Sequence, residues 1–213
     1  MSTRDATPHM RNVLIGARLF FGLLTLAALG KQFMVAVDNG HVANYFSFFT
    51  ILSSLFAAIV LVVGAVYLIR RRQPSEAYDI VRGSAVVAMA IVGLVFGLLL
   101  SRMENAGVVP LVNFVTHYLM PIVMVVDWLL QPPKSTLVPR HVGLWLIYPS
   151  AYLIYSLVRG AIVAWYPYWF IDPHKAPGGW SGVVLYSIAI SIGFLVVSGV
   201  LLFLGNRLKR RIV

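Results

Sequence analysis

Six long apolar runs separated by short polar segments constrain this chain more strongly than any other feature. A transmembrane helix needs about 20 predominantly apolar residues to cross the hydrocarbon core of a bilayer. Runs of about this length cover residues 13–37, 46–69, 83–100, 108–130, 142–164 and 182–204. The sequence therefore predicts an all-α, polytopic membrane protein built as a single bundle of six transmembrane helices. Because the connections are short, residues 1–213 are expected to form one transmembrane domain.

The charge content supports a membrane protein and argues against a nucleic-acid-binding protein. Only 11% of the residues are charged, whereas soluble domains carry about 25%. The net charge is +10, but the basic residues gather at the ends of apolar runs, as in residues 70–72 and 207–211. That placement suits membrane topology and anionic lipid headgroups. We therefore expect membrane lipids as partners and no nucleic acid.

The basic residues are distributed unequally between the two sides of the predicted bundle. The side with both termini holds twelve of them: Arg4, Arg11, Arg70, Arg71, Arg72, Arg82, Lys134, Arg140, Arg207, Lys209, Arg210 and Arg211. The opposite loops hold only Arg102 and Lys175. Cytoplasmic loops carry an excess of Lys and Arg. This bias predicts a multi-pass protein of the cell (inner) membrane with both termini in the cytoplasm.

Polar side chains recur on one face of four predicted helices, although exposure to lipid is costly for them. Residues spaced by three or four positions share a helix face. The faces are Arg18, Gly22, Thr25, Leu29 and Gln32; Ser47, Thr50 and Ser54; Asn113, His117, Met120, Met124 and Asp127; and Tyr148, Tyr152, Tyr155 and Arg159. These faces are expected to meet each other or a water-filled cavity. Arg18 and Asp127 fall at similar depth in the inner half, which predicts a structural ion pair.

Thr50 and His117 are the candidate catalytic residues, because both are predicted in the outer half of the membrane. A threonine hydroxyl becomes a nucleophile when a nearby base takes its proton, and imidazole suits that task near pH 7. Asp127 lies about 15 Å along the helix from His117, so Asn113 is expected to orient the imidazole. Arg159 is expected to stabilise an oxyanion or hold a carboxylate. The other expected pocket residues are Ser47, Tyr152 and Tyr155.

The Thr50–His117 pair and the aromatic segment 165–170 each have an alternative interpretation. A membrane threonine usually bonds to its own helix backbone, and a membrane histidine often bonds only to a neighbouring helix. The aromatic segment 165–170 follows the fifth predicted span. It is interpreted first as an interfacial aromatic belt, and second as a cap over a pocket that opens outward.

No motif in the sequence indicates a cofactor or a metal ion. The chain has no cysteine, and His9, His41, His141 and His174 lie in predicted tails and loops without metal-ligand spacing. No Gly-x-Ser-x-Gly elbow, P-loop or dinucleotide fingerprint is present. We therefore expect neither a cofactor nor a metal site, and the sequence leaves the oligomeric state open.

Three short motifs resemble the androgen-induced and androgen-dependent TFPI-regulating proteins. They are the segment Phe48-Phe49-Thr50-Ile51-Leu52-Ser53, the helix with His117, Pro121 and Asp127, and the segment Trp165-Tyr166-Pro167-Tyr168. Their order and placement relative to the predicted spans are similar to those of the family. On this resemblance the chain is identified as a bacterial member of that six-helix group.

The resemblance implies intramembrane hydrolysis, since animal members of the family cleave fatty acid esters of hydroxy fatty acids with a threonine and a histidine. Carried over, Thr50 attacks the ester carbonyl, His117 relays the proton, and a long-chain ester or fatty acid is the ligand. Two other functions stay open from the residues themselves. One is a small-molecule binder or transporter whose path the polar faces line. The other is a structural or regulatory protein whose polar groups lock helix packing.

Overall fold

The computed structural model describes residues 8–102 and 108–212, with the side chains of 210–212 left aside. Arg4 and the side chains of Arg210 and Arg211, which enter the predicted orientation, lie outside the described residues. Within the described part of the chain the elements are helical, with no strand. They are α1 (Pro8–Asp38), α2 (Val42–Tyr45), α3 (Phe49–Ile69), α4 (Glu76–Val95), η1 (Phe96–Leu100), α5 (Pro110–Phe114), η2 (Val115–Leu119), α6 (Met120–Leu130), α7 (Pro139–Val163), η3 (Trp169–Ile171) and α8 (Trp180–Ile212).

The predicted six-span architecture is confirmed by length and composition. Six helices in the described residues are long and apolar enough to cross a membrane: 8–38, 49–69, 76–100, 110–130, 139–163 and 180–209. The fourth of these consists of α5, η2 and α6 in succession. The third begins at Glu76 and not at residue 83, because Ser75 caps it by accepting a hydrogen bond from the Tyr78 amide at 3.1 Å. Because its first turns carry polar residues, the apolar run in the sequence begins later than the helix.

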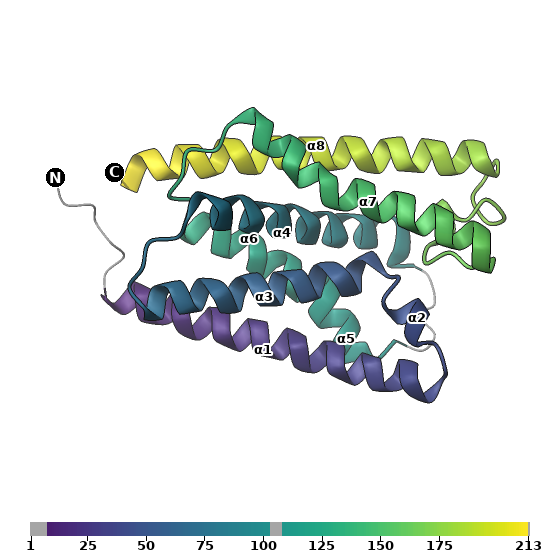
Figure 1. The fold of residues 1–213 in the computed structure, drawn as a ribbon, viewed down its shortest axis with the longest axis horizontal. Helices are drawn as coiled ribbons and strands as arrows, with labels where there is room; N and C mark the ends of the chain where they lie inside the picture. Colours follow the sequence, from purple (N-terminus) through teal and green to yellow (C-terminus); the bar gives the residue numbers. More distant parts are fainter. Residues whose placement is uncertain (1–7, 103–107, 213) are drawn as a thin grey trace.

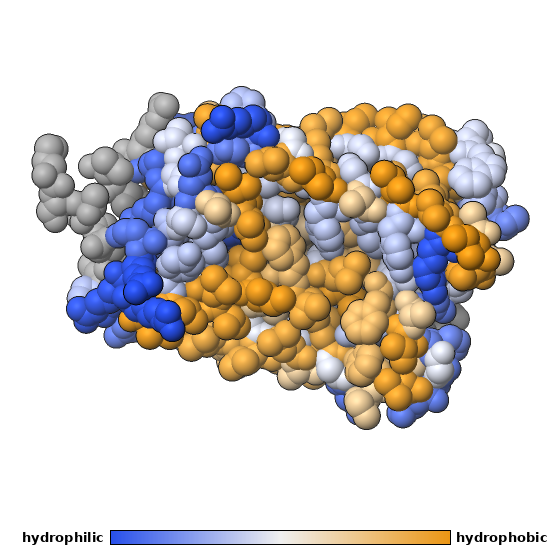
Figure 2. Space-filling model, viewed as in Figure 1, coloured by the Kyte–Doolittle hydropathy of each residue, from blue (hydrophilic) through white to orange (hydrophobic). Residues whose placement is uncertain are grey.

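The surface of the bundle is apolar along the middle of its length. Large side chains such as Ile154 of α7 (64% exposed) and Val196 of α8 (60% exposed) point outward. Figure 2 shows apolar side chains across the centre of one face, with the most hydrophilic residues gathered toward the two ends. A soluble monomer rarely exposes a contiguous apolar surface of this extent. The chain is therefore an integral membrane protein.

The helices form one bundle in which α4 contacts α3, α6, α7 and α8, while α1 packs along α3. In Figure 1, α1 begins and α8 ends at one end of the bundle, here called the terminal end. The opposite end carries α2 and is called the α2 end. Small residues allow close packing: a Cβ at Gly22 of α1 would lie 3.0 Å from Val62, and one at Gly93 of α4 would lie 2.9 Å from Pro121.

Several buried or partly buried hydrogen bonds connect the elements in the terminal half of the bundle. The Trp128 indole of α6 donates to the Leu201 carbonyl of α8 at 3.1 Å. The Trp145 indole of α7 donates to the Ile80 carbonyl of α4 at 2.8 Å. The Asn206 side chain of α8 donates to the Leu137 carbonyl at 2.7 Å. Leu137 lies two positions before the start of α7. In this half, α4, α6, α7 and α8 are therefore joined by polar contacts as well as by packing.

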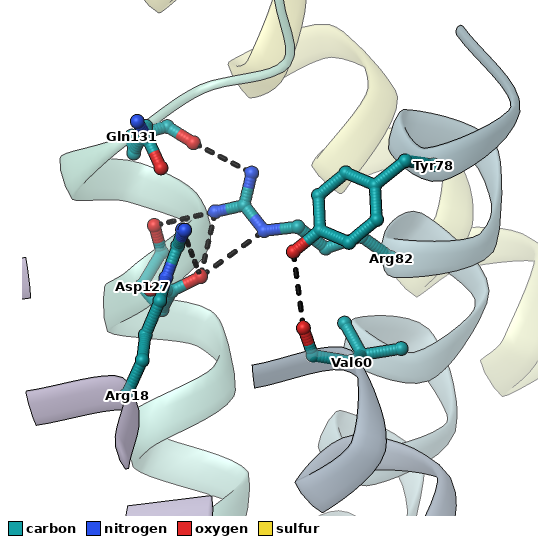
Figure 3. Close-up of polar contacts among 6 residues, drawn as sticks. All are labelled: Arg18, Val60, Tyr78, Arg82, Asp127 and Gln131. Carbon is teal, nitrogen blue, oxygen red and sulfur yellow. Dashed lines mark hydrogen bonds and ion pairs between the residues drawn. The ribbon is translucent and has the colours of Figure 1, made fainter. Parts of the chain in front are cut away.

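The predicted ion pair between Arg18 and Asp127 is present and includes a third residue (Figure 3). Arg18 Nε donates to Asp127 Oδ1 at 2.6 Å, and Arg82 Nη2 donates to Asp127 Oδ2 at 2.7 Å. Arg82 also donates to the carbonyls of Asp127 and Gln131, each at 2.7 Å. Arg82 was expected in a loop, but it is a buried residue of α4. One carboxylate thus joins α1, α4 and α6.

Candidate active site

Thr50 and His117 meet near the α2 end of the bundle, although they are 67 positions apart in the sequence. Thr50 is the second residue of α3, and its Oγ1 lies 3.2 Å from His117 Nε2. His117 lies in η2, a π-helical turn between α5 and α6. Single π-helical turns inside longer helices occur frequently at functional sites. This distance is within the range in which a base takes a proton from a hydroxyl.

The second ring nitrogen of His117 is held by its own helix. Nδ1 lies 3.3 Å from the Asn113 carbonyl oxygen and 3.2 Å from Thr116 Oγ1. The Thr116 hydroxyl already donates to the Val112 carbonyl at 2.9 Å. Thr116 Oγ1 and the Asn113 carbonyl oxygen can therefore both accept a hydrogen bond from Nδ1. We therefore assign the proton to Nδ1, which leaves the lone pair of Nε2 directed at Thr50. Imidazole in this tautomer is set up as a base.

Asn113 contacts the imidazole of His117 through its backbone carbonyl and not through its side chain. The carbonyl oxygen of Asn113 contacts Nδ1. The side-chain oxygen is buried and has no hydrogen-bond partner among the described residues. The ring of Phe96, in the π-helical turn η1, stacks on the imidazole with 4.1 Å between centroids. The ring plane of His117 is thus fixed from one side by Phe96.

Two tyrosines cap the first turn of α3, where helix amides have no partner within the helix. The Phe49 amide donates to the Tyr152 hydroxyl at 3.2 Å, and the Thr50 amide donates to the Tyr168 hydroxyl at 3.3 Å. Tyr152 donates in turn to the Ser47 carbonyl at 2.9 Å. The Tyr155 hydroxyl lies 2.8 Å from Ser47 Oγ, whose own proton goes to the Ala43 carbonyl. Ser47, Tyr152 and Tyr155 therefore support the helix end that carries Thr50.

Tyr168 lies beside Thr50 but was not among the predicted site residues. Its hydroxyl is 3.4 Å from Thr50 Oγ1, and burial raises the pKa of this phenol above its ordinary value. The belt interpretation of the aromatic segment is wrong for Tyr166 and Phe170, which are buried against the bundle. The segment packs inward as the cap interpretation expects. The resemblance motif contained Tyr168, but no spacing rule assigned it a contact.

Arg159 is placed differently from the expectation that it joins Thr50 and His117. Its Nη2 donates to Asn44 Oδ1 at 2.8 Å, and its guanidinium lies over the Trp165 ring, 5.1 Å from the centroid. Among the described residues that line the two cavities at the site, Arg159 does not appear. Its contacts connect α7 to α2 and to the aromatic segment. Arg159 therefore lies apart from the Thr50–His117 pair.

Two cavities meet at Thr50 and His117. The first, called the apolar cavity, has a volume of about 180 Å³ and lies between α4, α7 and α8. Most of its wall is apolar and includes Ile91, Val95, Leu153, Phe170, Ile190 and Phe194. The second, called the wider cavity, has a volume of about 490 Å³ and lies at the α2 end. Its wall includes the polar side chains of Gln32, Asn39, His41, Asn44 and Thr116.

The position of the aromatic segment depends on Gly160. A Cβ built on Gly160 would collide with the ring of Tyr166. We therefore expect Gly160→Ala to lower the free energy of unfolding by about 1–3 kcal/mol through overpacking, as measured by thermal unfolding in detergent micelles. A Cβ at Gly199 of α8 meets nothing within 4 Å, so Gly199→Ala is the matched control. Equal stability of the two variants would contradict this account.

Four described residues line both cavities, and three of them carry polar groups: Thr50, His117 and Tyr168, with Leu100 beside them. Thr50 therefore faces an apolar space on one side and a partly polar space on the other. This arrangement fits a molecule with a hydrocarbon part and a polar part joined at a reactive group. Comparison of the chain with protein-family models, with curated proteins and with solved structures found no match.

Proposed function

We propose that this integral membrane protein is a lipid-ester hydrolase in which Thr50 is the nucleophile and His117 the general base. One observation carries the proposal: Thr50 Oγ1 and His117 Nε2 lie 3.2 Å apart where the two cavities meet. Assignment of the proton to Nδ1 directs the basic lone pair of the imidazole at the hydroxyl. The resemblance to the threonine hydrolases named above agrees with this proposal.

The reaction follows from the positions of these groups. Thr50 Oγ1 forms a bond to the ester carbonyl carbon while its proton passes to His117 Nε2. The tetrahedral intermediate then collapses, the bond to the alcohol oxygen breaks, and that oxygen takes the proton from His117. Water attacks the acyl-threonine in the second half and gives its proton to His117. Collapse of the second intermediate returns the proton to Thr50 and releases the fatty acid.

In this proposal each of the two cavities binds one part of the substrate. A hydrocarbon chain gains free energy in the apolar cavity, at about 25 cal/mol for each Å² of apolar surface removed from water. The alcohol part and the attacking water require hydrogen-bond partners, which the wider cavity offers in Asn39, His41 and Asn44. The proposed substrate is therefore a long-chain ester with a polar alcohol part. With the termini in the cytoplasm, as the basic residues predict, the α2 end faces the outside of the cell membrane.

The proposal is tested with the purified full-length chain in detergent micelles. Wild type, Thr50→Ala and His117→Ala are incubated with a fluorophosphonate probe and with a panel of esters of increasing acyl length. We expect the wild type to be labelled and to prefer a long acyl chain, and both variants to lose labelling and hydrolysis. Equal labelling of all three proteins would remove Thr50 and His117 from the chemistry.

A lipid binder without hydrolytic activity is the second candidate, and the apolar cavity is the observation that favours it. Such a protein would retain fatty acid binding in the Thr50→Ala variant and would hydrolyse no ester in the panel. Binding is measured with a fluorescent fatty acid whose emission rises in an apolar site. Binding by wild type and Thr50→Ala, together with no turnover by either, would favour the binder over the hydrolase.

A further inference from the structure

We infer that the Tyr168 hydroxyl is the group that stabilises the oxyanion of the tetrahedral intermediate, and that Tyr168 is therefore a catalytic residue. The inference rests on the proposed function and concerns the same site. Attack by Thr50 turns the ester carbonyl oxygen into an oxyanion, which requires hydrogen-bond donors beside the nucleophile. Arg159, which was expected to meet this need, contacts Asn44 and Trp165 instead.

Among the described residues the Tyr168 hydroxyl contacts hydroxyl groups and a backbone amide, so its proton can turn from Thr50 Oγ1 to a substrate oxygen. The Tyr168 oxygen accepts from the Thr50 amide at 3.3 Å, and Thr50 Oγ1 lies 3.4 Å away. In the described part of the chain, no backbone carbonyl accepts a hydrogen bond from Tyr168. Tyr152, the other capping tyrosine, donates its proton to the Ser47 carbonyl. Of the two hydroxyls at this helix end, the one on Tyr168 can therefore turn toward an atom bonded to Thr50 Oγ1.

The position of Tyr168 suits this role for two further reasons. It lines both cavities, so a carbonyl group held between them lies against it. The oxyanion also forms beside the first turn of α3, where the helix macrodipole favours negative charge. The aromatic rings of Phe48 and Phe170 fix the Tyr168 ring, with centroids 5.8 Å and 5.2 Å away. The donor is thus held in place before the reaction begins.

Tyr168→Phe removes this donor and leaves the ring in place. We expect kcat for the preferred ester to fall on the order of 10²-fold with little change in KM, because the lost contact exists only in the transition state. Tyr166→Phe is the matched control, since Tyr166 lies in the same segment and lines neither cavity among the described residues. We expect it to retain the wild-type kcat. An unchanged kcat in Tyr168→Phe would overturn the inference.

A transition-state analogue separates catalysis from mere support of the helix end. A long-chain trifluoromethyl ketone forms a hemiketal oxyanion with Thr50, whereas a hydrocarbon of the same chain length carries no charge and accepts no hydrogen bond. We expect Tyr168→Phe to weaken the ketone on the order of 10²-fold and to leave binding of the hydrocarbon unchanged. A residue that only positions the helix end would weaken both ligands alike, and that result would overturn the inference.

A second variant keeps the hydroxyl and the shape, and it covers the case in which Tyr168→Phe does not fold. Difluorotyrosine at position 168 has a more acidic phenol. If the hydroxyl must donate, the alkaline limb of the kcat profile moves to lower pH, because a phenolate cannot donate. If the oxygen only accepts from the Thr50 amide, deprotonation leaves the profile in place and the inference fails. His117 and Tyr152, the neighbouring titratable groups, are the same in both proteins.

The two proposals fail in different ways. If Thr50→Ala and His117→Ala hydrolyse the ester like the wild type, the proposed function fails whatever Tyr168 does. If those two variants are inactive while Tyr168→Phe turns over at the wild-type rate, the hydrolase stands and only the role of Tyr168 is removed.

Discussion

Asp127→Asn is expected to lower the free energy of unfolding by about 3–5 kcal/mol, because removing one member of a buried ion pair leaves the other charge uncompensated. Here two guanidinium groups, those of Arg18 and Arg82, share the single carboxylate, and all three side chains are buried. The change keeps the shape of the side chain, so the loss comes from the charge. Chemical or thermal unfolding in micelles, followed by circular dichroism, measures it.

The matched control is an ion pair whose cation is exposed to solvent. Lys175 Nζ lies 3.5 Å from Asp172 Oδ2, and the side chains are 68% and 9% exposed. Asp172 also accepts a hydrogen bond from the His174 amide at 2.9 Å, and a solvated ammonium contributes little, so Lys175→Ala is expected to change stability by less than about 1 kcal/mol. A similar loss for Lys175→Ala and Asp127→Asn would show that the buried network contributes no more than a surface contact.

The second large effect is on turnover, where Thr50 and His117 are expected to act as one unit. Thr50→Ala and His117→Ala should each lower kcat by at least about 10³-fold, and the double variant should lose little more than either single one. The reason is that the base has no proton to take once the nucleophile is gone, and the nucleophile is weak without its base. Single-turnover hydrolysis of the preferred ester gives the three rates.

Two further variants are controls for the comparison of Thr50→Ala, His117→Ala and the double variant. Ser53→Ala removes a hydroxyl from the same helix, one turn from Thr50, where it contacts Tyr148 at 3.0 Å and lines neither cavity among the described residues. We expect it to keep the wild-type kcat. Thr50→Ser retains a hydroxyl and should retain measurable turnover. Independent, multiplicative losses for Thr50→Ala and His117→Ala would argue that the two residues do not share one proton transfer.

The fold could be predicted because lipid imposes a simple requirement on sequence. A spanning helix must be apolar for about 20 residues, and the six apolar runs coincide with six helices of the structure. The start of the third helix was missed because its first turns carry Asp79 and Arg82, which are buried in contact with other polar groups. Apolar content does not distinguish such a turn from a loop.

The site could be predicted only where helix periodicity fixes direction and depth. Thr50 and His117 each lie on the polar face of a helix, and those faces meet in the structure. Arg159 lies on the same helix as Tyr152 and Tyr155, but its long side chain pairs with Asn44 in α2. Tyr168 lies between helices, in a segment without periodicity, so its contacts depend on how the segment folds back. The π-helical turn at His117 was also not predicted.

The polar contacts of the terminal half have a consequence for how a lipid reaches Thr50. In that half α4, α6, α7 and α8 are joined by the hydrogen bonds of Trp128, Trp145 and Asn206. The apolar cavity lies toward the other end, between α7 and α8. We expect an acyl chain to enter this cavity sideways from the bilayer, between α7 and α8, without crossing water.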